Sequence, residues 1–365
     1  MKLTDMRSLV LKVLGVLLLP VILASQVLAA EGPSLSGFVD FGYNYNFNNK
    51  LANVLRTFDA NANSFTLQNT EIVLSGKSDG DVAYRVDVDY GFDASVIHSA
   101  GFGIAGQIDL QQAFISVPCE WTKGTVTLGK FVTPFGAEVI EAKDNFNTSR
   151  GLLFNYAIPF THTGIKWDKS WADNQWTTGL GLVNGWDNLQ DNNKGKTWLA
   201  TLGWNPVEKF AWTVGLAYGP EQSVATPSIE KNGRGLFDTV VKFVPTDRLT
   251  LVANYDWGTE EGLANVTSGL VGTEKWSGLG LHANFAFSEN CSAALRFENF
   301  DDSGSRTGTE QVLTSYTATL QHKHNDITGR IEFRHDNSSD KVFVKNNGTT
   351  TKGQDTIGIQ WIYSF

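Results

Sequence analysis

From about residue 35 onward, apolar and polar residues alternate along the chain with a period of two. The run from 82 to 90 is the clearest case, because apolar residues at every second position are separated by charged ones. The apolar set is Val82, Tyr84, Val86, Val88 and Tyr90, and the charged set is Arg85, Asp87 and Asp89. Such alternation predicts a β-strand whose two faces lie in unlike environments.

The same period predicts about sixteen strands, an even number. They are expected at 37–47, 65–76, 82–90, 108–117, 125–131, 160–167, 175–183, 197–204, 210–218, 234–244, 249–257, 275–287, 291–300, 312–323, 327–336 and 354–365. Short connections such as 77–81 and 288–290 alternate with long ones such as 50–64 and 258–274. Short turns at one end and long loops at the other are typical of a transmembrane antiparallel β-barrel of the outer membrane. The predicted fold is therefore all-β: one barrel with short periplasmic turns and long extracellular loops.

The two faces of the predicted strands differ in a way that favours a membrane barrel over a soluble β-sandwich. Tyr and Trp gather near strand ends, which suits aromatic girdles at the lipid interfaces. Charged residues lie in mid-strand, where Lys or Arg facing lipid would cost about 2–4 kcal/mol each. Those charges are therefore expected to line a wet lumen, or to pair across neighbouring strands. The predicted pore-lining residues are Asp40, Glu71, Arg85, Asp87, Asp89, Lys166, Arg296, Glu298, Arg330, Glu332 and Arg334, with Asp238 and Lys242 as further members.

The N-terminal segment has the composition of a secretory signal peptide. A basic segment with Lys2, Arg7 and Lys12 is followed by an apolar run at 13–23. Small residues after this run permit cleavage after Ala29 or Ala30. We therefore expect a signal peptide at 1–30 and a barrel domain at 31–365. The net charge of the chain is -9, and removal of three bases and one acid (Asp5) leaves -11. Such acidity argues against a nucleic-acid partner, and two cysteines make no disulfide framework.

The last residues of the chain continue the alternation. Trp361, Tyr363 and Phe365 fall on one face of the final predicted strand. This ending resembles the terminal signal by which outer-membrane barrels are recognised for insertion. The barrel-assembly machinery is therefore an expected partner, together with outer-membrane lipid and lipopolysaccharide.

Several longer motifs resemble a known family. They are DLQQAF at 109–114, GKFVTPFGAEVIEAKDNFNTSR from Gly129, AIPFTHTG from Ala157 and VNGWDNLQDNNKGKT from Val183. These stretches resemble the putative β-barrel porin-2 family of Gram-negative bacteria. The resemblance implies an outer-membrane porin; it implies no defined substrate and supplies no catalytic residues.

The connection at 132–159 is the longest and has no regular period. It is rich in aromatic residues, so it is not expected to be disordered. Its place after the fifth strand is similar to that of the constriction loop of general sixteen-stranded porins. We expect this loop to fold into the lumen and to oppose wall bases such as Arg296, Arg330 and Arg334. The predicted constriction residues are Glu138, Glu141, Lys143, Asp144 and Arg150.

Other candidate chemistry is weak. The Asn/Asp-rich stretch at 187–193 offers oxygen atoms to a divalent cation, although its spacing is not that of an EF-hand. A surface loop with Asx turns is the simpler interpretation. His322 and His324 lack further metal ligands nearby in sequence, and no Ser, His and acid arrangement is readable. No metal, cofactor or enzymatic activity is predicted.

The resulting hypothesis is an outer-membrane porin that passes small hydrophilic solutes and ions by diffusion. Two alternatives stay open: a channel dedicated to one solute class, such as an oxyanion or an oligosaccharide, and a plugged structural or adhesive barrel without conductance. The sequence leaves the ion preference open, and a homotrimer is expected only by analogy with other sixteen-stranded porins.

Overall fold

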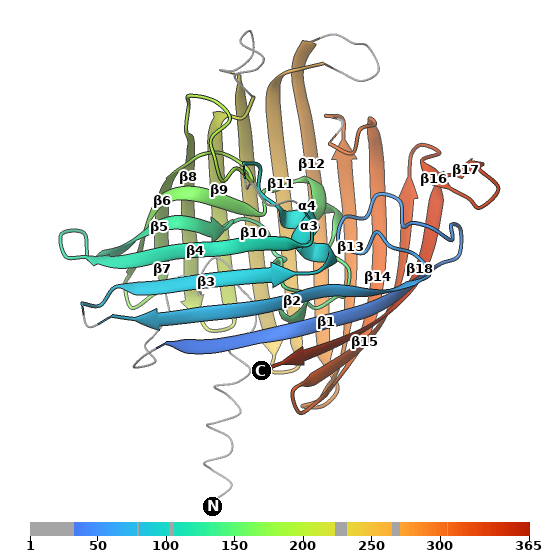
Figure 1. The fold of residues 1–365 in the computed structure, drawn as a ribbon, viewed down its shortest axis with the longest axis horizontal. Coiled ribbons are helices and arrows are strands. Elements are labelled where there is room, and N and C mark those ends of the chain that lie inside the picture. The colour runs from blue at the N-terminus through green and yellow to red at the C-terminus, as the bar shows by residue number, and fades with distance from the viewer. Residues whose placement is uncertain (1–32, 79, 102–105, 223–231, 265–270, 305) are drawn as a thin grey trace, which may run out of the picture.

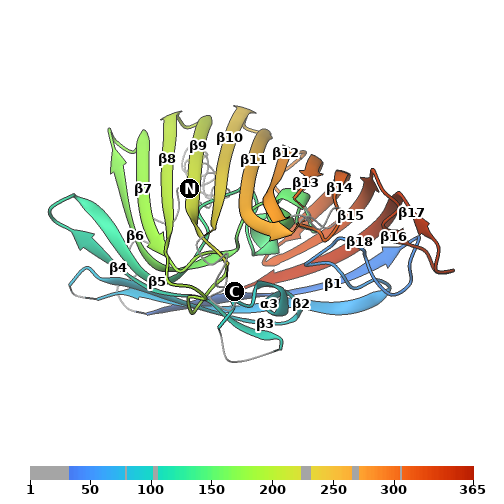
Figure 2. The same cartoon turned by 90° about the horizontal axis from the view of Figure 1, so that it is seen from above.

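A closed antiparallel barrel contains most of the chain, and within the described residues it has sixteen strands. The computed structural model describes residues 33–78, 80–101, 106–222, 232–264, 271–304 and 306–365. Figure 1 views the barrel from its side, so that strands of the near and far walls cross, and Figure 2 shows the same wall curving round from above. The predicted fold class is confirmed. The predicted signal peptide at 1–30 lies outside the described residues.

The barrel strands follow the chain in order, and each pairs with its sequence neighbours. They are β1 (Ser34–Asn46), β2 (Ser64–Lys77), β3 (Ala83–Tyr90), β4 (Ile108–Cys119), β5 (Gly124–Val132), β6 (Thr161–Trp171), β7 (Trp176–Val183), β8 (Thr197–Val207), β9 (Phe210–Pro220), β10 (Gly233–Thr246), β11 (Leu249–Ala264), β12 (Val271–Ala286), β13 (Cys291–Asp302), β14 (Gln311–His324), β15 (Ile327–Ser338) and β18 (Gly353–Ser364). Each predicted strand is present, and most extend a few residues further.

The first and last strands close the barrel. Val39 lies opposite Tyr363 and Asp40 lies opposite Ile362 in the ladder between β1 and β18. Beyond this ladder, Gly37 and the terminal Phe365 exchange two backbone hydrogen bonds of 3.0 Å. The final residue of the chain is therefore part of the seam.

Short elements inside the long loops were not predicted from the sequence. They are the helices α3 (Phe92–Ile97) and α4 (Leu152–Tyr156), a 3-10 turn η1 (Ala142–Asp144), and a two-stranded hairpin of β16 (Phe343–Val344) and β17 (Thr350–Thr351). Their shortness explains why a periodicity argument misses them. In the described part of the chain, no helix is long and apolar enough to cross a membrane.

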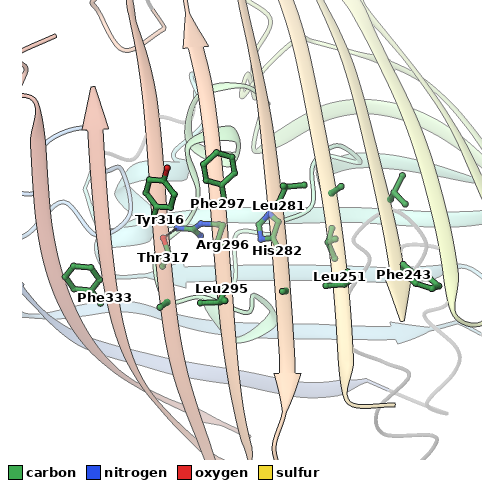
Figure 3. Close-up of a pocket in the computed structure, with 15 residues that line it drawn as sticks. Phe243, Leu251, Leu281, His282, Leu295, Arg296, Phe297, Tyr316, Thr317 and Phe333 are labelled. Carbon is green, nitrogen blue, oxygen red and sulfur yellow. Dashed lines mark hydrogen bonds between the residues drawn. The ribbon is translucent and has the colours of Figure 1, made fainter. Parts of the chain in front are cut away.

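The outer wall exposes apolar side chains. Leu180 is 58% exposed and Trp198 is 65% exposed, whereas inward Asp40 and Asp87 are fully buried. Figure 3 shows the lining of an apolar hollow of about 670 Å³ on β10 to β15, which includes outward side chains such as Phe243, Leu281 and Phe333 together with inward residues such as Arg296. An apolar exterior with polar residues inside is the arrangement expected for a barrel in lipid.

An apolar cluster also lies inside the barrel, and its wall residues were not predicted from the sequence. Wall residues of β7 to β14 pack against apolar residues of the 132–160 connection and against Phe58 and Ile97 from two other loops. The wall residues include Val183, Leu199, Leu236, Trp276, Phe300 and Leu313, and those of the connection include Phe135, Ile140, Leu152, Leu153, Phe154 and Ile158. Burial of a large apolar side chain contributes about 1.5–3 kcal/mol. The six large side chains of the connection therefore contribute on the order of 10 kcal/mol to its packing.

Candidate functional site in the barrel interior

Residues 133–160, called the inward loop below, leave β5 and contact strands far round the barrel. The backbone N–H of Gly136 donates to Asp238 on β10 across 3.1 Å, and that of Ala137 donates to Asn254 on β11 across 3.1 Å. Further along, the indole of Trp276 on β12 donates to the carbonyl of Ala157 across 3.1 Å. These contacts hold the loop inside the barrel, because all three partners belong to the inner face.

Three arginines of β13 and β15 hold the middle of the inward loop; Arg296, Arg330 and Arg334 are called the arginine wall below. Arg330 donates to the carbonyls of Ala142 and Asn145 across 2.7 and 2.8 Å. Arg296 donates a hydrogen bond to the carbonyl of Ser149 across 2.5 Å, and Arg334 donates one to the carbonyl of Arg150 across 2.7 Å. A guanidinium offers five donors in a planar fork, so one side chain can satisfy several carbonyls.

Two acids on the same strands, Glu298 and Glu332, also bind the loop, but as hydrogen-bond acceptors. Glu332 accepts hydrogen bonds from the backbone N–H groups of Thr148 and Ser149, at 2.7 and 3.1 Å. Glu298 accepts one from the backbone N–H of Leu153 across 3.1 Å. The irregular backbone of the loop is thus paired with charged wall side chains, which removes the cost of burying unsatisfied peptide groups.

The loop acids do not all face the arginine wall, so that part of the prediction was wrong. Glu138 does, because it receives a hydrogen bond of 2.6 Å from Arg296. Glu141 instead accepts from Gln111 on β4 across 2.5 Å, and Asp144 pairs with its neighbour Lys143 across 2.5 Å. The arginine wall meets mainly carbonyl oxygens, which have no side-chain signature in the sequence.

The protonation of two loop groups follows from their surroundings. Burial alone would raise the pKa of Glu138, but Arg296 and the N–H of Gly151 outweigh burial and hold the pKa below its usual value. For Lys143, burial opposes the charged form, while Asp144 and Glu141 favour it and raise the pKa. Glu138 therefore stays an anion and Lys143 a cation.

The last predicted constriction residue, Arg150, turns away from the arginine wall. Its guanidinium pairs with Asp93 of α3 across 3.0 Å and lies 4.6 Å from the ring centre of Phe58. Asp93 was not predicted as a site residue. The sequence carried no signal for it, since it lies in a long loop without a motif. Arg150 thus ties the inward loop to two other loops.

The wall of β2 to β4, called the acidic wall below, carries a row of carboxylates. In the strand ladders Glu71 lies opposite Asp89, and Asp89 lies opposite Asp109. All three are buried, and Asp109, which the sequence analysis missed, pairs with Lys130 across 3.2 Å. Carboxyl groups directly opposite one another in a sheet repel when both are ionised, so this row disfavours full ionisation of its members.

The other predicted pore-lining residues take individual partners. Arg85 pairs with Asp87 across 2.9 Å on β3, and Lys166 pairs with Asp168 across 3.0 Å on β6. Asp40 accepts a hydrogen bond of 2.7 Å from Gln360. Both ion pairs join residues two positions apart on the same strand, so they are not the pairs across neighbouring strands that were the alternative considered from the sequence.

The candidate metal ligands are occupied by protein contacts. One carboxylate oxygen of Asp187 accepts from the backbone N–H groups of Phe160 and Thr161, at 2.8 and 2.9 Å. His322 lies 3.2 Å from the sulfur of Cys291. Across the ranges that the structure describes, no three His, Cys, Asp or Glu side chains are grouped to hold a metal ion.

Almost the whole chain matches the model of one known protein family. The family model described as Putative beta-barrel porin-2, OmpL-like, matches residues 33–365. The chain belongs to this family. No curated protein matches the sequence.

Solved structures of similar fold include an outer-membrane channel, a porin and another outer-membrane protein. The outer membrane channel DcaP of Acinetobacter baumannii has a TM-score of 0.64 and 10% identity, over 93% of this chain and 100% of that one. The anion-selective porin from Comamonas acidovorans has a TM-score of 0.62 and 11% identity, over 92% and 99%. OmpT of Vibrio cholerae, in a trimer form, has a TM-score of 0.61 and 11% identity, over 92% and 100%. At these identities the likeness shows the fold alone.

This member of the β-barrel porin-2 family is a porin-like barrel of the outer membrane and not an enzyme. Its terminal residues Trp361, Tyr363 and Phe365 lie on the exposed face of the barrel, at the seam between β18 and β1. Their predicted role as an insertion signal stays a prediction.

Proposed function

We propose that the protein is a narrow diffusion channel for small hydrophilic solutes and ions, with the inward loop as its constriction. The contact between the arginine wall and the loop supports this most directly, because it holds the loop across the lumen. Pore-facing charges and constrictions set which ions pass. The predicted site residues of the loop and the wall would therefore act by narrowing and charging the path.

We further propose that cations pass in preference to anions. On the inner faces of β1 to β5, five acids stand against the two bases Arg85 and Lys130; the acids are Asp40, Glu71, Asp87, Asp89 and Asp109. On β13 and β15, three inward arginines stand with four inward acids, Glu298, Asp302, Glu332 and Asp336, and Glu138 adds one more acid from the loop. Acidic side chains therefore outnumber basic ones on both walls, most strongly on the first.

Planar-bilayer recording of the purified mature protein tests both statements. We expect discrete single-channel currents in potassium chloride, and under a salt gradient a reversal potential of the sign for potassium preference. A reversal potential of the opposite sign would refute the cation preference while leaving a channel. Block of the current that saturates with an added oxyanion or oligosaccharide would instead favour a substrate-specific channel.

A plugged barrel is the second candidate, and the apolar cluster inside the barrel favours it. Side chains such as Phe135, Leu153, Trp276 and Phe300 pack together there as in a soluble core. A protein that inserts into bilayers yet gives no current above the leak of protein-free membranes would support a plugged structural or adhesive role. That result would also overturn the diffusion channel.

We propose a homotrimer as the assembled form, because a structure of similar fold, OmpT of Vibrio cholerae, is described as a trimer. Outer-membrane lipid, lipopolysaccharide and the barrel-assembly machinery are the other expected partners. Mass measured by light scattering in mild detergent, corrected for bound detergent, tests the trimer: one or two chains per particle would contradict it.

A further inference from the structure

The β16–β17 hairpin is fastened to the start of the first long loop. The backbone N–H of Asn346 donates to the carbonyl of Asn48 across 3.0 Å, and the side chain of Asn346 accepts from the backbone N–H of Lys50 across 2.8 Å. The amide of Asn48 in turn donates to the carbonyl of Gly353 across 2.8 Å. Figures 1 and 2 both show the hairpin beyond the end of β18, at the rim of the barrel. Two loops that are distant in sequence thus form one built surface.

A polar hollow of about 590 Å³ lies between these two loops. Six of the side chains that line it are Phe47, Asn48, Lys345, Asn346, Asn347 and Asp355. Three amides, one carboxylate and one ammonium group therefore surround the hollow, with one aromatic ring at its edge. Ligand sites commonly combine a few placed polar groups with an aromatic surface.

Tyr45 and Phe47 indicate where the hollow lies along the membrane normal. Tyr45 and Phe47 continue the outward-facing set of β1, are 43% and 57% exposed, and pack edge to face with ring centres 5.0 Å apart. Aromatic side chains at strand ends mark the interface between lipid and water. The hollow lies at the long-loop end of β1 and β18, which is the extracellular end. It is therefore at the height of the headgroups of the outer leaflet.

The charges of the hollow favour an anionic, hydroxyl-rich ligand. In the described part of the chain, Lys345 has no carboxylate within ion-pair distance. Asp355 is engaged by His335 across 2.8 Å, so its carboxylate is not the counter-ion of Lys345. An ammonium group binds phosphate as a point charge. Amide groups both donate to and accept from hydroxyls.

We propose that this hollow binds the phosphorylated sugar headgroup of an outer-leaflet glycolipid. Lys345 contacts a phosphate, the amides of Asn48, Asn346 and Asn347 bind sugar hydroxyls, and Phe47 packs against the apolar face of a ring. The occupant is a lipid because the hollow opens beside lipid-facing positions of β1 and β18, outside the lumen. This site is independent of the channel proposal.

The test uses the purified mature protein in detergent and native mass spectrometry with rough lipopolysaccharide as the probe. Lys345→Glu is compared with Lys341→Glu, which makes the same charge change in the same loop at an exposed position that does not line the hollow. We expect Lys345→Glu to weaken binding on the order of tenfold, and Lys341→Glu to leave binding within about twofold of the unmodified protein, because Lys341 lies outside the hollow. Dephosphorylated glycolipid should bind both variants alike, and free inorganic phosphate should not compete.

Equal affinity of the two variants would overturn the proposal, as would competition by inorganic phosphate alone. If Lys345→Glu changes the oligomeric state instead of lipid binding, the hollow is a contact with a second copy and the proposal is wrong. Lys345→Gln removes the charge without reversing it. It should give a smaller loss in the same direction, which keeps the test decisive if Lys345→Glu folds poorly. Heat-modifiable migration confirms that each variant is a folded barrel.

Discussion

Arg296 on β13 and Glu138 in the inward loop form a buried ion pair of 2.6 Å between residues 158 positions apart in the sequence. Both side chains are almost inaccessible to solvent. Arg296 also reaches Glu298 across 3.1 Å and the carbonyl of Ser149. Loss of one partner of a buried pair typically costs about 3–5 kcal/mol, because it leaves a charge uncompensated. This pair is therefore a main anchor of the loop.

Glu138→Gln should loosen the inward loop without unfolding the barrel. The unfolded-state pKa of Glu is about 4.3, and the folded-state pKa lies below it. The stabilisation by Glu138 is therefore fully present above about pH 4.3 and is lost as the pH falls through the folded-state pKa. Single-channel traces of the unmodified protein should become noisier or more conductive in that acidic range. The variant should show this behaviour already at pH 7, and quiet, unchanged traces would contradict the anchor.

Neutralising the acidic wall should reduce the cation preference. In the double variant Glu71→Gln and Asp89→Asn, two opposed carboxylates become amides of similar shape, so the strands should still pair. We expect the reversal potential under a salt gradient to move towards zero. The control carries Asp81→Asn and Asp247→Asn, which remove the same charge from exposed turn residues. An equal shift in both variants would show that the acidic wall has no special role.

Excision of residues 136–155 should raise the single-channel conductance and lower the thermal stability of the barrel. The higher conductance follows because the segment crosses the interior, and the lower stability follows because Trp276, Phe300 and Leu313 would lose their apolar partners. The thermal midpoint of heat-modifiable migration and the bilayer current measure the two effects. Unchanged conductance in a folded barrel would refute the constriction.

Deletion of Phe365 should lower the yield of barrel in the outer membrane. The deletion removes both backbone hydrogen bonds to Gly37 at the seam, together with an exposed terminal ring. We expect a several-fold loss of heat-modifiable protein in outer-membrane fractions, with little change in total expression. Deletion of Ser34, the first residue of β1, is a suitable control because Ser34 makes no backbone hydrogen bond to Phe365. Equal yields for the two deletions would contradict a special role of the last residue.

The sequence by itself determined the barrel, its strands and, where the alternation is clean, the face that a strand residue occupies, whereas it left the facing of β2, β4 and β5 open. Alternation is informative because successive side chains of a strand face opposite sides of the sheet. One side faces lipid and favours apolar residues, and the other faces the barrel interior and favours polar residues. The prediction for 82–90 is an example, since Val88 and Tyr90 are exposed on the outer wall whereas Asp87 and Asp89 are buried inside. Strand ends were less well determined because pairing continues beyond the alternating core, as in β11 and β12.

Only the tertiary structure decided how the interior is filled. Arg330 binds the carbonyls of Ala142 and Asn145, and backbone oxygens look alike at every position of a sequence. A polar lumen was expected, yet Trp276 and Phe300 point inward, because apolar side chains of the inward loop pack against them. Likewise Asp93 and Arg150 meet only because two separate loops enter the same barrel. Contacts between irregular segments depend on their path through space, which no local period encodes.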